Sequence, residues 1–182
     1  MKYLALAGAV IASLLSASLQ ASQSYPLLAV EDGDTLVVMI EGHQTRVQLA
    51  GIDAPENVPN PKFLLDKQRT QLEENRLLAL GEAATDYLSK LLTGAQHIEL
   101  TGNLSKQDKY GRTLAEAFDN NGTSINQRMV REGYAIGNKH MKNATELKKT
   151  LQKLQVQASQ AQSGLWQLDK QAMSLWSGIP SH

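Results

Sequence analysis

Two short acidic motifs hold the residues whose types and spacing are suited to chemistry. The first is Asp-Gly-Asp-Thr over residues 32–35, and the second is Gly-Ile-Asp-Ala-Pro-Glu over residues 51–56. Each motif alone is explained by turn formation, because Asp, Gly and Pro favour turns. Together they place Asp34, Asp53 and Glu56 at adjacent ends of neighbouring strands, where mutual repulsion is costly unless a cation neutralises it.

The ligand chemistry of these motifs favours a hard cation. Carboxylate and carbonyl oxygens are the ligands that Ca²⁺ and Mg²⁺ take in proteins. The chain has no cysteine and its four histidines are scattered singly, which argues against zinc. The sequence therefore predicts a site for Ca²⁺ or Mg²⁺.

A third motif, Asp-Lys-Tyr-Gly-Arg over residues 108–112, offers a positive charge. Its arginine, Arg112, is explained equally well as a solvated surface residue, which is the commonest state of arginine. Beside a metal site, however, a planar guanidinium suits a phosphate or the charge that builds up when phosphate is attacked. The residues alone leave both interpretations open.

The elements that must position these motifs follow an α+β order. Residues 25–51 alternate as three strands with a hairpin turn at Glu41-Gly42. A helix is expected over residues 81–94, then strands over 98–101 and 113–118, a helix from a Ser124/Gln127 capping box to Gly133, and a last helix over 145–163. Short strands of this kind suit a small closed barrel with helices packed outside.

Two segments fit this plan less well. Residues 57–80 begin with Pro59 and Pro61 and continue as a polar helix, so we interpret them as an insertion. Residues 167–182 show no clear period, and we describe them only as a C-terminal tail. The domain proper is expected over residues 22–166.

Bulk properties predict one exported domain. A chain of 182 residues supports one well-buried core. Residues 1–21 read as a signal peptide, because their apolar run is shorter than the ~20 residues of a membrane-spanning helix, and the mature protein is then secreted or periplasmic. Removing Lys2 with this segment leaves 17 basic and 18 acidic residues, so a polyanion must be held by a local patch or a metal.

The three motifs in this order, with a helix near residues 125–135 and Gly-Leu-Trp at 164–166, resemble the staphylococcal nuclease (thermonuclease) family. The resemblance extends over residues 25–166. It implies a five-stranded OB-type barrel with about three packed helices, here with an inserted helical segment. It also implies a monomeric, calcium-dependent phosphodiesterase, an endonuclease that hydrolyses DNA or RNA with low sequence selectivity.

The resemblance also implies a role for each site residue. The calcium ion would be held by Asp34, Asp53 and the backbone carbonyl of Ala54. Glu56 would act as general base or position the attacking hydroxide, and Arg112 would stabilise the transition state. Two neighbours of that arginine would lie near the phosphate, Lys109 and Tyr110.

One position departs from the family pattern. The family has an arginine five residues before the metal-binding aspartate, and that position here is Gln48. Compensation is expected from Arg46, which lies on the same strand face roughly 7 Å away, or from Arg69 or Arg76 in the inserted segment. The alternative is a catalytically weak or inactive OB-fold module that binds nucleic acid, which Gln48 and the near-neutral charge favour.

Overall fold

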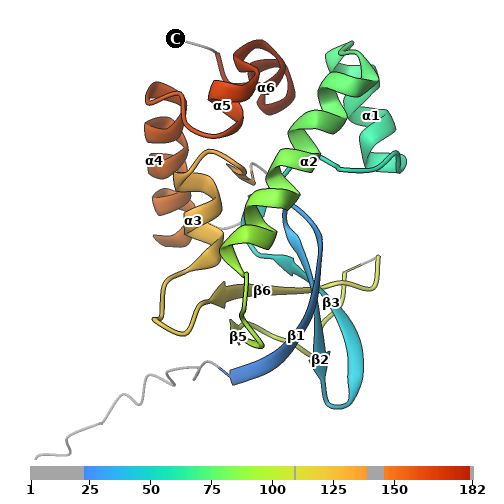
Figure 1. The fold of residues 1–182 in the computed structure, drawn as a ribbon, viewed down its shortest axis with the longest axis vertical. Helices are drawn as coiled ribbons and strands as arrows, with labels where there is room; N and C mark the ends of the chain where they lie inside the picture. Colours follow the sequence, from blue (N-terminus) through green and yellow to red (C-terminus); the bar gives the residue numbers. More distant parts are fainter. Residues whose placement is uncertain (1–22, 109, 139–145, 181–182) are drawn as a thin grey trace, which may run out of the picture.

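A closed five-stranded barrel forms the base of the molecule (Figure 1). The computed structural model describes residues 23–108, 110–138 and 146–180. The barrel strands follow the order β1-β2-β3-β6-β5, in which β3 and β6 are parallel and the other pairs antiparallel. Their bounds are Gln23–Asp32 (β1), Thr35–Ile40 (β2), His43–Leu49 (β3), His97–Thr101 (β5) and Thr113–Phe118 (β6). The expected barrel is thus confirmed, whereas the predicted signal peptide lies outside the described residues.

The period-two pattern of the strands explains the barrel interior. Leu36 and Val38 of β2 and Val47 and Leu49 of β3 are fully buried, while the residues between them face outward. The turn at Glu41-Gly42 has φ of 49° and 82° at its two residues, the positive values that a tight two-residue hairpin requires. This hairpin fixes the register in which Thr35 pairs with Gln48.

Helices cover one end and one side of the barrel (Figure 1). A two-stranded sheet, β4 (Ile52–Asp53) with β7 (Ile136–Gly137), lies beside them. The helix bounds are Pro61–Thr70 (α1), Glu74–Leu91 (α2), Ile125–Arg131 (α3), Glu146–Gln160 (α4), Leu165–Leu168 (α5) and Lys170–Ser177 (α6). In the described part of the chain, every helix is too short or too polar to cross a membrane.

The segment over residues 57–80 differs from the single polar helix that its sequence predicts. It forms α1 and the first turns of α2, with a break at Gln71, whose φ is 55°. A left-handed residue of this kind ends a helix. The second helix begins at Glu74 rather than near residue 81, because Leu77 and Leu80 extend its buried face.

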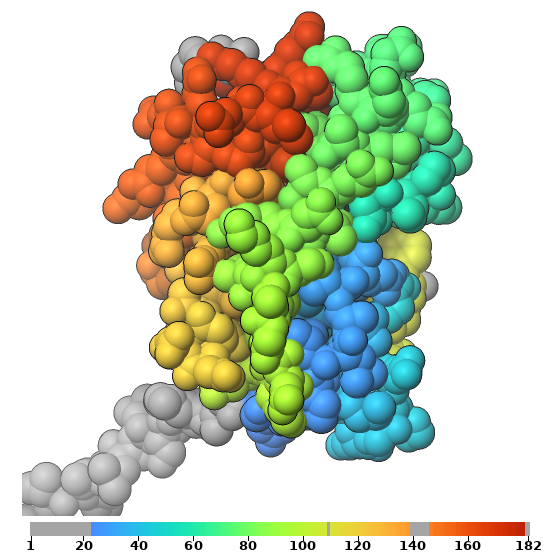
Figure 2. Space-filling view, in the orientation of Figure 1, coloured from blue at the N-terminus to red at the C-terminus, as the bar shows by residue number. Residues whose placement is uncertain are grey.

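The C-terminal residues pack against this segment. Met173 and Trp176 of α6 are buried, at 0% and 3% exposure. The guanidinium of Arg76 pairs with both carboxylate oxygens of Asp169, at 2.9 Å each. Figure 2 shows the red C-terminal helices lying against the green and teal chain of α1 and α2. Residues 167–180 are therefore part of the folded unit.

We expect Trp176→Ala to lower the free energy of unfolding by about 3–5 kcal/mol, because it removes a buried aromatic side chain. Urea denaturation measures this change. The control is Leu175→Ala, one residue earlier and 44% exposed, which should cost under about 1 kcal/mol. Equal losses in the two variants would contradict a specific role for the Trp176 side chain.

Candidate active site

The two acidic motifs meet beside the barrel. Asp34 follows β1 and is 5% exposed, and its Oδ2 accepts a hydrogen bond of 3.1 Å from the backbone N–H of Ala54. Its own N–H donates to Oδ1 of Asp32 at 2.9 Å. The carbonyl of Asp34 accepts from the N–H of Leu49 at 2.7 Å, which ties the turn to β3. The structure thus brings together the motifs that lie about 20 residues apart in the sequence.

Two glycines let helix α2 approach both motifs closely. A Cβ at Gly33 would lie 2.7 Å from the Cβ of Ala84 and 2.8 Å from that of Ala54. A Cβ at Gly81 would lie 2.1 Å from the carbonyl oxygen of Glu56. All three distances are shorter than side chains permit, so the absence of a side chain at Gly33 and Gly81 sets the position of the acidic motifs against α2.

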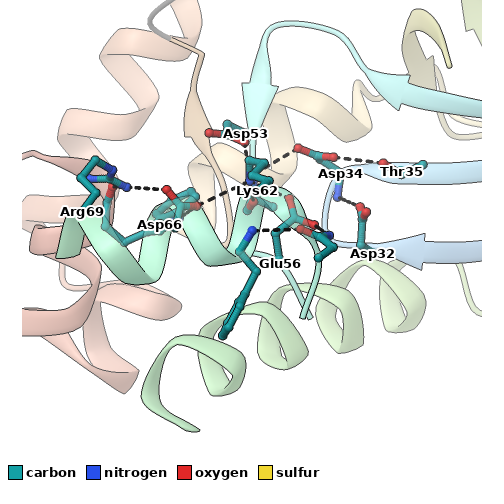
Figure 3. Close-up of polar contacts among 12 residues, drawn as sticks. Asp32, Asp34, Thr35, Asp53, Glu56, Lys62, Asp66 and Arg69 are labelled. Carbon is teal, nitrogen blue, oxygen red and sulfur yellow. Dashed lines mark hydrogen bonds and ion pairs between the residues drawn. The ribbon is translucent and has the colours of Figure 1, made fainter. Parts of the chain in front are cut away.

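A lysine that sequence reasoning missed stands in the middle of the cluster (Figure 3). The Lys62 ammonium lies 3.1 Å from Oδ1 of Asp53 and 2.7 Å from Oε1 of Glu56. It also donates to the carbonyl of Ala54 at 3.0 Å. Lys62 belongs to the first turn of α1, whose N-cap is Asn60. Asn followed by Pro is a helix-start signal at this point, but nothing in the sequence indicates where the lysine would point.

The same helix start orients Glu56. The Asn60 side chain accepts from the N–H of Phe63 at 2.9 Å, which caps α1, and its amide donates to Oε2 of Glu56 at 2.5 Å. Since Oε1 of Glu56 contacts Lys62, each carboxylate oxygen has a fixed partner. A carboxylate held in this way is suited to accept a proton at a defined position.

Burial and charge perturb the titration of the cluster. Burial, and after it the charges of Asp32 and Asp53, raise the pKa of Asp34 to about 8, against the opposing effect of Lys62. Burial also raises the pKa of Asp53. Burial alone would lower the pKa of Lys62, but the carboxylates of Asp53, Glu56 and Asp34 outweigh it and raise that pKa. The surrounding carboxylates therefore stabilise the charged form of the Lys62 side chain.

A cavity of about 440 Å³ opens beside the cluster, and its lining includes Glu56, Lys62, Arg46, Arg112 and Tyr110. The Arg112 guanidinium lies 5.3 Å from the centre of the Tyr110 ring. Each of the two arginines forms an ion pair with an acid that is not among the predicted site residues. Arg46 pairs with Glu31, and its Nε lies 2.6 Å from Oε2. Arg112 pairs with Asp108.

Asp108 organises the loop that carries Arg112. Its Oδ1 accepts from the N–H of Tyr110 at 2.8 Å and from that of Arg112 at 2.9 Å. Its Oδ2 accepts from Nε and Nη2 of the Arg112 guanidinium at 3.1 and 3.0 Å. Burial opposes ionisation, but these donors outweigh it and lower the pKa of Asp108. The predicted phosphate contact at Lys109 lies outside the described residues.

Comparison with known proteins assigns this fold to a family. Residues 46–168 match the family model described as staphylococcal nuclease homologue. The chain belongs to the staphylococcal nuclease family. It is 28% identical to a thermonuclease of Staphylococcus hyicus over 144 residues, 79% of this chain and 76% of that protein. A thermonuclease of Staphylococcus intermedius is 30% identical over 145 residues, 80% of this chain and 77% of that protein.

A longer relative also matches. An uncharacterized protein of Bacillus anthracis is 31% identical over 142 residues, 78% of this chain. The matched region spans 60% of the length of that relative.

The position of the missing family arginine can now be described. Gln48 is partly buried on β3 and pairs with Thr35 and Leu114 of the neighbouring strands. Of the three arginines considered as substitutes, Arg46 lines the cavity. The other two were wrongly placed by the sequence: Arg69 contacts Asp66 and the carbonyls of Leu175 and Trp176, and Arg76 contacts Asp169. The start of α1 lines the cavity through Pro61 and Lys62. The two arginines lie further along the chain and contact α6 and Asp169 instead.

The donor set fits the hard cation that the resemblance implies. Among the described residues, no group of three or more His, Cys, Asp or Glu side chains is arranged to hold a metal ion. The Lys62 ammonium is instead the cation that Asp53, Ala54 and Glu56 surround. The groups around it offer oxygen donors, which are the type of ligand that Ca²⁺ and Mg²⁺ take.

We expect Gly81→Ala to lower the free energy of unfolding by about 1–3 kcal/mol, because its Cβ would meet the backbone of Glu56. This loss should exceed the ~1 kcal/mol that alanine contributes to a helix interior. Thermal or urea unfolding measures it. The control, Ser89→Ala at an exposed position of α2, should change stability by about 0.5 kcal/mol or less. If Gly81→Ala is as stable as the wild type, the close approach of Gly81 to the Glu56 backbone does not exclude a side chain at this position.

Proposed function

We propose that this protein is an exported, calcium-dependent nuclease that hydrolyses phosphodiester bonds of DNA or RNA with little sequence selectivity. The observation that carries the proposal is one cavity lined by Glu56, Arg46 and Arg112, directly beside the carboxylates of Asp34 and Asp53. A positioned base and guanidinium groups are the parts that phosphodiester hydrolysis requires. Membership of the nuclease family supports a nucleic-acid substrate.

Each residue has a role in this reaction. Glu56, oriented by Asn60, accepts a proton from the attacking water as the new P–O bond forms and the bond to the leaving oxygen breaks. Arg112 and Arg46 donate hydrogen bonds to the phosphoryl oxygens and stabilise their developing charge. Asp34, Asp53 and the carbonyl of Ala54 would hold Ca²⁺, which supplies Lewis acidity and charge neutralisation when bound.

Two further parts of the proposal rest on the sequence. Export is supported by residues 1–21, whose charged start, apolar run and small residues have the layout of a signal peptide. Low sequence selectivity is supported by the assignment of the cavity's arginines to phosphate groups, because phosphate contacts carry no sequence information directly.

To test this, the purified chain from Ser22 onward is incubated with single- and double-stranded DNA and RNA in the presence of Ca²⁺, Mg²⁺ or a chelator, and cleavage is measured. We expect cleavage in Ca²⁺ that chelator abolishes. Glu56→Gln should lower the rate by about 10²–10⁴-fold through loss of the base. The control is Lys67→Ala, on α1 and ion-paired with Glu74, which should leave the rate unchanged. No cleavage in any condition, or equal rates for Glu56→Gln and wild type, would sink the proposal.

A second candidate function is a nucleic-acid-binding module without catalysis. The uncharged Gln48 favours it, because an arginine that stabilises a phosphoryl transition state contributes about 10³–10⁵-fold in rate. Binding of labelled single-stranded DNA by the wild type, with no cleavage in Ca²⁺ or Mg²⁺, would support this candidate over the enzyme.

The role of Arg46 separates these candidates further. If Arg46 supplies the charge that Gln48 lacks, Arg46→Ala should lower the cleavage rate by about 10³-fold or more. Adding Gln48→Arg to Arg46→Ala should then restore much of the rate. Steady-state cleavage of a fluorogenic oligonucleotide measures both changes. An Arg46→Ala rate equal to that of the wild type would show that Arg46 does not compensate.

A further inference from the structure

We propose that Lys62 is a resident cation of the carboxylate cluster, and that its ammonium and a divalent cation bind the cluster alternately and never together. The proposal concerns the site of the proposed nuclease and rests on that function for the choice of Ca²⁺ as the ion. Its test measures metal binding and the environment of Lys62, so nuclease activity is not needed for the result.

The Lys62 ammonium lies close to three oxygens of the cluster, one hydrogen-bonded and two ion-paired. An ammonium has three N–H donors and no acceptor. The three nearest oxygens are Oε1 of Glu56 at 2.7 Å, the carbonyl of Ala54 at 3.0 Å and Oδ1 of Asp53 at 3.1 Å. Two of these three groups, Asp53 and Ala54, are the ones that the family resemblance assigns to the metal.

The inserted segment and the C-terminal helix build the position of the ammonium. Asn60 caps α1 and so fixes the helix turn from which Lys62 projects. Asp66, one turn later, lies 3.9 Å from the ammonium and accepts a hydrogen bond of 3.0 Å from the indole N–H of Trp176. The Trp176 ring lies 5.8 Å from the ammonium, within range of a cation–π contact. These contacts show that Lys62 is oriented by its surroundings (Figure 3).

The Lys62 ammonium and a divalent ion would compete for these oxygens. Calcium binds oxygen ligands at roughly 2.3–2.6 Å and needs their lone pairs directed at it. Oδ1 of Asp53 and the carbonyl oxygen of Ala54 already contact the Lys62 ammonium, and a second positive charge beside it is repelled. Metal binding therefore requires Lys62 to leave the cluster.

The first test is calorimetric titration of the purified protein with Ca²⁺ at fixed pH. Lys62→Met removes the charge while keeping an unbranched side chain against Trp176. We expect it to bind Ca²⁺ about tenfold or more tightly than wild type, because apparent affinity falls with the fraction of molecules whose site is open. The matched control is Lys67→Met, also on α1 and paired with Glu74 outside the cluster, which should bind like wild type.

Two calorimetric outcomes would overturn the proposal. One is equal Ca²⁺ affinity in Lys62→Met and wild type. The other is the absence of binding in both, because a cluster freed of its lysine should accept the ion. If either outcome is found and the protein still has nuclease activity, the proposed function is retained and the proposed role of Lys62 is rejected. Conversely, tighter binding without nuclease activity would support Lys62 and reject the enzyme.

A second measurement on the wild type does not depend on the variant folding. The protein is prepared with ¹³C-labelled lysine, and the side-chain resonances of Lys62 and Lys67 are followed by NMR during Ca²⁺ addition. Displacement predicts that the Lys62 resonance moves from its metal-free position as Ca²⁺ binds, while that of Lys67 stays in place. An unchanged Lys62 resonance at saturating Ca²⁺ would refute the alternation.

Discussion

The structure around the site depends on neutralising carboxylates that converge where little water reaches them. The barrel forces this convergence through its backbone, because the carbonyl of Asp34 is bonded to β3 and its carboxylate to the N–H of Ala54. Asp34 is only 5% exposed and Asp53 lies close by, so burial and like charge both oppose ionisation at this position. The counter-charge comes from Lys62, which lies outside the barrel.

This dependence extends to parts of the chain far from the cavity. Lys62 is held on α1, whose Asp66 contacts Trp176 of α6, and α2 is tied to the same region by the pair between Arg76 and Asp169. Residues 169–180 follow the part of the chain that matches the family model, yet they support the helix that carries the ammonium. Several polar side chains of the inserted segment, among them Asp66, Arg69 and Arg76, make these contacts.

The barrel was predictable because its signals are local. Alternation in β2 and β3, the Glu41-Gly42 turn and the N-cap at Ser124 each depend on nearby residues, and the structure has all three. The reciprocal half of the predicted capping box is replaced by a bond from the Gln127 side chain to Glu116. The meeting of the acidic motifs followed from strand order. The contact partners of Lys62, Asp66, Arg69 and Arg76 could not be predicted in this way, because no periodic pattern in the sequence connects these residues to their partners. Hence the sequence indicated the carboxylates but neither the lysine among them nor the acids that hold the arginines.

Charge at the cavity connects the two halves of the site. Its lining carries three cationic side chains (Arg46, Lys62 and Arg112) and three anionic ones (Glu31, Asp32 and Glu56), so the formal charges cancel. A cavity without net charge attracts a phosphodiester weakly, and the whole chain, with as many basic as acidic residues, adds no long-range field. A divalent ion in the adjacent cluster would make the same cavity positive. Electrostatics therefore couples the affinity of the cavity for phosphate to the affinity of the cluster for a divalent ion. The free energy needed to displace Lys62 lowers both affinities.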